Sequence, residues 1–239
     1  MVRPLIPDPG ILIGEVLVVS DLHLGFEGEL QKKGIRIPSQ TNRILKEILK
    51  MVERTKARRV ILLGDVKHGV PSASYMEWRH IPDFLKELSS RVSSLEIIMG
   101  NHDGDLLPLT PRNVKIHPTN GLRIGNTWLL HGNAVPPHKA EKAKFLITGH
   151  VHPAIELTDK FGFKTIQPVW LKCKSPRLPL TLIVMPALNG MVGHLVVNRM
   201  RHDGARLGPV FKWAKIDIHE CEAYTLDGTL LGVLKDLRD

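Results

Sequence analysis

The chain has 239 residues, of which 43% are hydrophobic and 24% are charged. This composition is ordinary for a soluble globular protein and excludes a long disordered chain. Lysine and arginine outnumber aspartate and glutamate by 33 to 24, which gives a net charge of +9. Such a charge favours a polyanionic partner, and it is equally compatible with a basic protein that has no such partner.

The cysteines and the early apolar stretch bear on where the protein resides. Cys173 and Cys221 are far apart in the sequence and form no Cys-x-x-Cys motif, so we expect unpaired thiols in a reducing compartment. The apolar stretch 11–19 is interrupted by Glu15 and is too short to cross a bilayer. It also lacks the layout of a signal peptide. We therefore expect a cytoplasmic protein without a membrane partner.

The first hundred residues alternate predicted strands and helices. Residues 1–14 contain three prolines and are expected to form a surface arm, and residues 25–38 a long basic loop. Short apolar runs predict buried strands at 15–20, 60–63 and 95–99. Helical spacing predicts one helix that begins at Ser39 or Thr41 and one that begins at a Ser74–Glu77 capping box and is kinked or divided by Pro82. This order predicts a parallel sheet.

Short strands dominate after Asp103, with one short helix expected around residues 139–144. A final hairpin is predicted to turn at Asp227-Gly228. The other predicted strands lie at 114–116, 121–124, 127–130, 145–148, 169–172, 181–185, 194–197 and 211–218.

Five of the predicted strands end in polar clusters. The clusters are Asp21/His23, Asp65/His68, Asn101/His102/Asp103, His131 and His150/His152. A single histidine at a strand end is more often an ordinary loop residue that forms a hydrogen bond. Five such ends in one chain are hard to explain in that way, because strand ends of α/β sheets meet at one edge, where ligands bind.

The ordered set DLH, GD, GNHD, HG and GHVH closely resembles the motifs of the calcineurin-like metallophosphoesterases. The resemblance covers residues 15 to about 153. It implies an α/β fold, a four-layer αββα sandwich of two mixed β-sheets flanked by helices, with a two-metal site at one edge. We expect a single domain over residues 1–239, in which 1–153 carries the motifs and 154–239 completes the sandwich.

The resemblance also implies roles for individual residues. The first metal would be held by Asp21, His23 and His152. The second would be held by Asn101, His131 and His150. Asp65 would bridge the two ions, and His102 would face the scissile phosphate as a proton donor or charge stabiliser. Imidazole with carboxylate and amide oxygen suits two divalent transition metals, with manganese expected first and iron, zinc or nickel as alternatives.

His68 departs from one branch of this family. The Ser/Thr phosphoprotein phosphatases carry an aspartate at this position, whereas a histidine resembles the repair nucleases of the SbcD kind. We expect His68 and His102 to face the phosphate as a catalytic pair; simple packing of His68 in its loop is the alternative. Asp103 is expected to support a ligating histidine, and an exposed loop carboxylate is the alternative reading.

The expected function is hydrolysis of a phosphodiester, with DNA or RNA as the expected substrate, by in-line attack of a hydroxide that bridges the metals. Lys67 could contact phosphate or face solvent, while Lys32, Lys33 and Arg36 could follow a nucleic-acid backbone. Only 5% of the residues are aromatic, so no stacking platform for bases is visible.

One alternative is a phosphodiesterase or phosphatase acting on a small nucleotide or cyclic nucleotide. Another is a non-catalytic scaffold, which would require missing ligands. The oligomeric state stays open, with a dimer among the possibilities.

Overall fold

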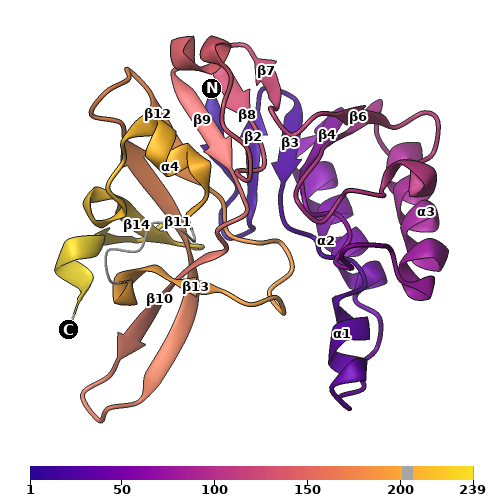
Figure 1. The fold of residues 1–239 in the computed structure, drawn as a ribbon, viewed down its shortest axis with the longest axis horizontal. Helices are drawn as coiled ribbons and strands as arrows, with labels where there is room; N and C mark the ends of the chain where they lie inside the picture. Colours follow the sequence, from indigo (N-terminus) through magenta and orange to yellow (C-terminus); the bar gives the residue numbers. More distant parts are fainter. Residues whose placement is uncertain (201–206, 239) are drawn as a thin grey trace.

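The computed structural model describes residues 1–200 and 207–238, and within them two mixed β-sheets lie face to face (Figure 1). Strands β3 to β6 of the first sheet run parallel, while β1 and β2 are antiparallel to their neighbours. In spatial order the first sheet contains β1 (Val2–Pro4), β2 (Gly10–Ile13), β3 (Val16–Val19), β4 (Arg59–Leu63), β5 (Ser94–Ile98) and β6 (Lys115–His117).

The second sheet comes from the later part of the chain. Its main path contains β13 (Leu195–Val196), β10 (Pro153–Thr158), β11 (Lys164–Lys174), β12 (Thr181–Val184), β9 (Phe145–Thr148), β8 (Thr127–Leu129) and β7 (Leu122–Ile124). Strand β14 (Glu222–Thr225) pairs with both β11 and β15 (Leu230–Val233). The hairpin at Asp227-Gly228 is therefore confirmed.

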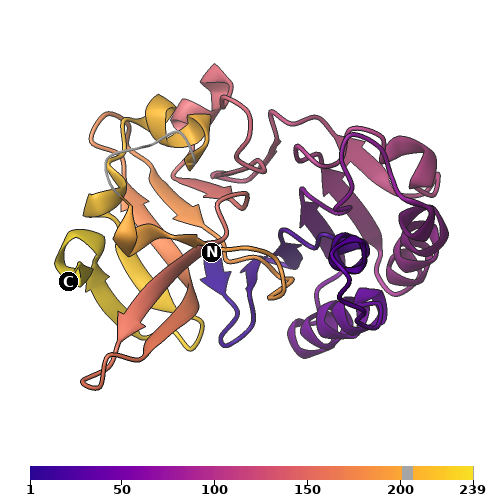
Figure 2. The same cartoon turned by 60° about the horizontal axis from the view of Figure 1, so that its bottom comes forward.

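Helices cover the outer face of each sheet, on opposite sides of the molecule (Figure 2). Helices α2 (Thr41–Thr55) and α3 (Tyr75–Ser90) pack on the first sheet, and α4 (Pro209–Ala214) packs on the second. Helix α1 (Phe26–Lys32) projects from the side of the first sheet. Short 3-10 segments lie at Leu107–Leu109, His138–Lys142, Val197–Arg199, Ile218–Glu220 and Leu234–Leu237. The predicted four-layer αββα sandwich is confirmed.

Strand β4 shows how the layers are held together. Val60 and Leu62 pack against the helices of the first sheet, while Ile61 and Leu63 lie between the two sheets. All four are fully buried, because alternate side chains of a strand point to opposite faces and both faces are covered. The burial of both faces explains why β4 is a continuous apolar run. The end of β4 sets the position of the polar residues that follow it.

Several sequence expectations for helices are confirmed and others are wrong. The Ser74–Glu77 capping box begins α3 as predicted, and α3 continues through Pro82 as one helix, so the predicted division into two helices is wrong. Buried side chains on both sides of the proline, including Ile81 and Phe84, hold the two halves to the same sheet. Helix α2 has Gln40 as its N-cap and no side-chain cap hydrogen bond, so the expected cap at Ser39 or Thr41 is wrong.

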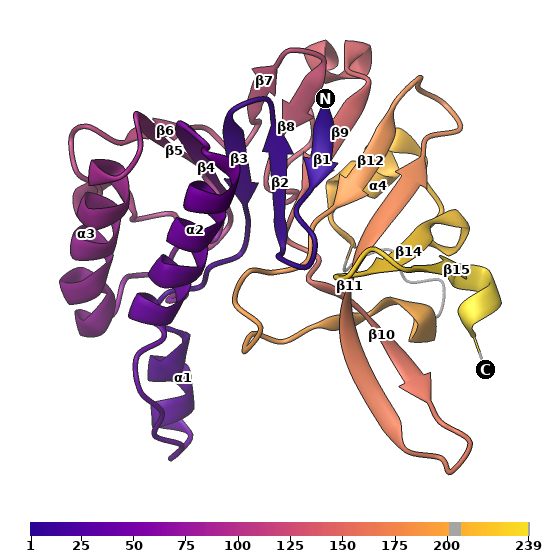
Figure 3. The same cartoon turned by 180° about the vertical axis from the view of Figure 1, so that it is seen from behind.

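The expected surface arm at residues 1–14 is wrong as well. Strands β1 and β2 extend the first sheet beside β3 (Figure 3). Prolines fit this arrangement because Pro4 ends the edge strand and the other two lie in the turn that follows.

Two segments form helices instead of the expected loop and strand. Part of the expected loop 25–38 is helix α1. Residues 211–218 do not form a strand, since α4 buries Val210, Phe211 and Ala214 at helical spacing.

Cys173 and Cys221 form a buried disulfide, so the expectation of unpaired thiols is wrong. The two residues are 48 apart in sequence, but Lys172 and Glu222 are paired across β11 and β14, which places the cysteines side by side. Only that long-range pairing reveals their proximity. Among the residues that the structure describes, no helix is long and apolar enough to cross a membrane.

Candidate metal centre

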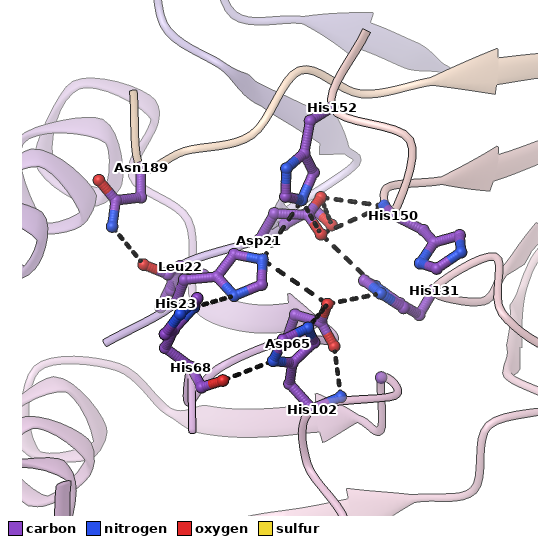
Figure 4. A network of polar contacts seen from close by, with 12 residues as sticks. Asp21, Leu22, His23, Asp65, His68, His102, His131, His150, His152 and Asn189 are labelled. Carbon is purple, nitrogen blue, oxygen red and sulfur yellow. Dashed lines mark hydrogen bonds and ion pairs between the residues drawn. The ribbon is translucent and has the colours of Figure 1, made fainter. Parts of the chain in front are cut away.

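The polar motifs meet where loops from both sheets approach one another (Figure 4). The loops after β3 and β4 run side by side, since the amides of Asp21 and His23 donate to the carbonyls of Gly64 and Asp65 at 3.2 and 2.9 Å. His131, His150 and His152 approach from the second sheet, after β8 and β9. The expectation that these strand ends converge is confirmed.

An unusual backbone conformation places five of the candidate ligands. Their φ angles are positive: Asp21 59°, His23 43°, Asp65 51°, His150 68° and His152 46°. They make up five of the seven positive-φ residues other than glycine that the described part of the chain contains. Left-handed backbone costs such residues of the order of 1–3 kcal/mol each and clusters at functional sites. Asp21 and His23 therefore converge through loop geometry and not through strand alternation, since β3 ends at Val19.

The first cluster contains Asp21, His23 and His152. His152 Nε2 lies 3.1 Å from Asp21 Oδ1 and 3.3 Å from His23 Nε2. Metal–ligand bonds of about 2.0–2.2 Å place two ligand atoms on one ion roughly 3.0–3.4 Å apart. These three side chains are therefore spaced as ligands of one ion would be.

The second cluster contains Asp65, His131 and His150. His131 Nε2 lies 3.2 Å from Asp65 Oδ2, and the same oxygen lies 3.6 Å from His23 Nε2 of the first cluster. Asp65 Oδ1 accepts a hydrogen bond from the amide of His102 at 2.9 Å. Oδ1 of Asp65 is thus held by the backbone amide of His102, and Oδ2 faces both clusters.

Hydrogen bonds on the outer side of the site orient two histidines. Nδ1 of His131 contacts the carbonyl of Leu63, and Nδ1 of His152 contacts the carbonyl of Gly193, each at 2.9 Å. A ring that donates through Nδ1 presents the lone pair of Nε2 to the site. With Nδ1 of His131 donating to Leu63, the buried Nε2 faces Asp65 Oδ2 at 3.2 Å as acceptor to acceptor, as expected for two atoms that ligate a metal. The donor set therefore fits a transition metal.

Charges in the site are strongly coupled. Burial opposes ionisation of Asp65, but His131 outweighs it and lowers the pKa of Asp65 to about 2. Burial likewise opposes the charged form of His131, and Asp65 with Asp21 raises its pKa to about 9. Burial lowers the pKa of His23 to about 3 and that of His150 to about 4. The two carboxylates are anionic and need positive charge around them.

Two motif glycines make room for candidate ligands from other strands. A side-chain carbon at Gly100 would overlap the carboxylate of Asp65, and one at Gly149 would overlap Asp21 and Ser20. Ser20 was not singled out from the sequence, yet its Oγ lies 2.7 Å from Asp21 Oδ2 and 2.9 Å from the carbonyl of Leu63. Its only sequence signal is that it directly precedes Asp21.

The segment after β5 also reaches the candidate metal centre. Asn101 is exposed and lies between Gly100, which contacts Asp65, and His102. His102 directs Nδ1 to the carbonyl of His68 at 2.5 Å, and its Nε2 lies 3.9 Å from Asp65 Oδ2. Only Nε2 of His102 therefore faces the site.

His68 stacks on His102 with ring centroids 5.5 Å apart, but both of its nitrogens face other protein groups. Nε2 lies 2.8 Å from Glu29 Oε2, and Nδ1 lies 3.3 Å from Nδ1 of His23. Glu29 belongs to α1, inside the expected loop, and no local sequence signal marks it.

Asp103 and Lys67 are both fully buried, and their partners differ from those expected. Asp103 accepts hydrogen bonds from the amides of Val66 and Gly100, each at 2.9 Å, so it joins two loops and does not support a histidine ring. Lys67 pairs with Asp105 at 2.8 Å. Its expected contact with phosphate and its solvent-facing alternative are both wrong, because the ammonium is enclosed by protein. The predicted backbone-tracking cations Lys32, Lys33 and Arg36 are exposed on and after α1.

Comparison with solved structures finds a nuclease with the same fold. The chain is similar to the nuclease MPE of Pseudomonas putida, with 18% identity and a TM-score of 0.60 over 93% of this chain and 91% of that chain. It also aligns with Yfce, a phosphoesterase from E. coli, with 14% identity and a TM-score of 0.46 over 91% of this chain and 96% of that chain. No curated protein matches the sequence.

The family assignment rests on the sequence itself. Residues 14–168, well over half of the chain, match the model of the calcineurin-like phosphoesterase family. The matched span contains all of the motifs that meet at the candidate metal centre. The chain therefore belongs to the calcineurin-like phosphoesterases and is a metal-dependent hydrolytic enzyme of that family.

Proposed function

We propose that this phosphoesterase uses two divalent metal ions to hydrolyse phosphodiester bonds in nucleic acid. The observation that carries the proposal is the position of Asp65 Oδ2, 3.6 Å from His23 Nε2 and 3.2 Å from His131 Nε2. The two histidines belong to different clusters, so a single carboxylate oxygen can serve both. A carboxylate shared by two adjacent ions would hold them close together, as two-metal hydrolysis needs.

The proposed ligand sets follow from these clusters. Asp21, His23 and His152 would hold one ion. Asn101, His131 and His150 would hold the other, and Asp65 would be shared. When bound, the ions would supply Lewis acidity that acidifies water and offsets the charge of the phosphate. Because imidazole nitrogens are combined with carboxylate and amide oxygens, we propose transition metals, with manganese first and iron, zinc or nickel as alternatives.

His102 is the proposed residue for proton transfer to the leaving oxygen. Its Nδ1 is held by the carbonyl of His68 at 2.5 Å, which leaves Nε2 as the nitrogen that reaches into the site. Asp65 Oδ2, 3.9 Å away, lies on the same side. The ring is therefore oriented with one titratable atom toward the place where a phosphate would lie.

Three features support nucleic acid as the substrate. The chain carries a net charge of +9, Lys32 of α1 is exposed and lines the same groove as His102, and Arg36 is exposed after that helix. A structure with the same fold is described as a nuclease. Basic residues near a phosphodiesterase site favour a polyanion over a small neutral ester.

We also propose a single domain over residues 1–239 and a cytoplasmic location. The disulfide between Cys173 and Cys221 gives a cytoplasmic location no support, because disulfides are rare in reducing compartments. Cell fractionation tests it directly.

A substrate panel tests the proposed function. Metal-free protein is loaded in turn with manganese, iron, zinc or nickel and assayed on bis-p-nitrophenyl phosphate, mononucleotides, cyclic nucleotides, single strands and duplexes. We expect turnover of diesters and of polynucleotides, with a steep loss on polynucleotides as salt increases. Equal rates on mononucleotides and long strands would support the small-nucleotide alternative instead.

A further inference from the structure

A groove of 490 Å³ opens directly beside the candidate metal centre. Helix α1 forms one wall, with Gly25, Gly28 and Lys32. Val70, Tyr75 and Met76 contribute to the other wall, at and before the start of α3. His102 also lines the groove, so the groove begins where the scissile phosphate of the proposed reaction would lie.

The wall at and before the start of α3 is apolar and largely uncovered. Tyr75 is 77% exposed, Val70 58% and Met76 38%. The opposite wall is open because Gly28 has no side chain, and a carbon placed there would meet nothing within 4 Å. Large apolar side chains that gather around a groove in a soluble protein mark a binding surface.

The carboxylates that line the groove are already bound by protein groups. Glu29 is bound by His68 at 2.8 Å and by Lys33 at 2.5 Å. Glu77 is buried, and its carboxylate accepts hydrogen bonds from backbone amides of the surrounding loop. Lys32 is exposed at the edge of the groove and can contact a backbone phosphate, whereas a flat neutral ring would contact the apolar wall.

We propose that this groove binds the nucleobase of the nucleoside attached to the scissile phosphate, with Tyr75 as the side chain on which the base stacks. The inference rests on the proposed function and names the part of the substrate that the site recognises beyond the phosphate. The volume lies within the range of about 300–1,000 Å³ that is usual for sites of small organic groups. Tyr75 and His102 then act on neighbouring parts of one substrate.

Two esters with the same leaving group test the proposal. The p-nitrophenyl ester of thymidine 5′-phosphate carries a nucleoside, and methyl p-nitrophenyl phosphate carries only a methyl group. We expect Tyr75→Ala to lower kcat/KM for the nucleoside ester by roughly 5- to 150-fold, the range that base stacking provides, and to leave the methyl ester within about twofold.

A second variant obstructs the groove without endangering the fold. Gly28 lies inside α1, and leucine is a better helix former than glycine, so Gly28→Leu fills the groove while favouring the helix. It is expected to lower turnover of the nucleoside ester selectively. Trp78→Ala is the matched control, since Trp78 is an exposed aromatic residue of the same helix as Tyr75 and does not line the groove.

The outcomes separate the two proposals. If the wild type hydrolyses both esters, and Tyr75→Ala and Gly28→Leu change neither or lower both equally, the base-binding groove is overturned while the phosphodiesterase function stands. If no metal supports hydrolysis of either ester, the proposed function fails and the groove's role fails with it. A selective loss in both variants, with Trp78→Ala unchanged, supports the groove.

Discussion

Glu29 and His68 are joined by a contact of 2.8 Å between Oε2 and Nε2, and this contact begins a chain that ends at His23. A ring that donates from Nε2 to a carboxylate keeps the lone pair of Nδ1, which can accept from Nδ1–H of His23 at 3.3 Å. His23 then presents Nε2 to the candidate metal centre as a lone pair. Glu29, a helix residue that contacts no candidate ligand, thus sets the tautomer of the candidate ligand His23.

Removing Glu29 should therefore weaken metal binding. We expect Glu29→Ala to reduce the affinity of metal-free protein for Mn²⁺ or Zn²⁺ by about tenfold, the lower end of the effect of losing a group that orients a ligand. The affinity is measured by competition with a chromophoric chelator. Glu29→Gln keeps an acceptor for His68 and should restore part of the loss.

Glu47→Ala is the matched control, because Glu47 forms an i,i+4 ion pair with Arg43 on α2, as Glu29 does with Lys33 on α1. The two glutamates have similar side-chain exposures, 40% for Glu29 and 38% for Glu47. Equal metal affinities for Glu29→Ala and Glu47→Ala would show that the chain through His68 has no influence on His23.

Gly100 should not tolerate a methyl group. A Cβ there would overlap the carboxylate of Asp65, so Gly100→Ala is expected to displace Asp65 and lower metal occupancy and rate together. Gly104→Ala is the control in the same loop, since a Cβ at Gly104 meets nothing within 4 Å. Metal content and thermal unfolding are measured for both. Full metal occupancy in Gly100→Ala would disprove the required close approach.

His102→Ala should retain the metals and slow hydrolysis, because His102 belongs to neither of the two clusters that Asp65 joins. We expect kcat to fall by about 10²- to 10⁴-fold for esters with poor leaving groups and only slightly for esters that release p-nitrophenolate, because proton donation to the leaving oxygen is lost. The measurement is kcat across aryl phosphodiesters of graded leaving-group pKa, with metal content as the control. A loss of equal size for all esters would instead assign His102 a purely electrostatic role.

Glu96 should make stability depend on pH outside the active site. It is 4% exposed and accepts hydrogen bonds from Arg59 at 2.6 and 2.8 Å and from His117 at 2.6 Å. Burial raises its pKa, but these bonds outweigh burial and lower the pKa below the ordinary 4.5. The resulting stability is present above about pH 4.5 and is lost as pH falls through the lower pKa of the folded state.

The Glu96→Gln variant tests this dependence. At pH 7 its free energy of unfolding should be lower than that of the wild type by about 2 kcal/mol, the contribution of hydrogen bonds to a charged group. The difference should shrink as pH falls below 4.5 in urea unfolding experiments. Glu87→Gln breaks an exposed pair with Arg91 and should cost less than about 1 kcal/mol at any pH. A difference for Glu96→Gln that stays constant with pH would contradict the ionic account.

The sequence predicted those parts of the fold that have a local cause. Strands β4 and β5 are continuous apolar runs because both faces are buried, and α3 begins at a capping box that is visible in the sequence. The polar residues that follow β4 and β5 were recognised as one site because parallel strands end at one edge.

The remaining features depend on contacts between distant segments. Glu29 and His68 are 39 residues apart in the sequence, and the two cysteines are 48 apart, so no local sequence pattern indicates either pair. The left-handed backbone of Asp21 and Asp65 is also invisible in sequence, since these residue types adopt it only when the surrounding structure imposes it.

The number of metal ions held by Asp65 tests the central claim most directly. After dialysis against Mn²⁺, the wild-type protein and Asp65→Ala are compared by inductively coupled plasma mass spectrometry and by circular dichroism, which confirms folding. The shared position of Asp65 Oδ2 between His23 and His131 predicts two ions per wild-type chain and loss of both from folded Asp65→Ala. Two ions retained by Asp65→Ala would contradict the bridging role.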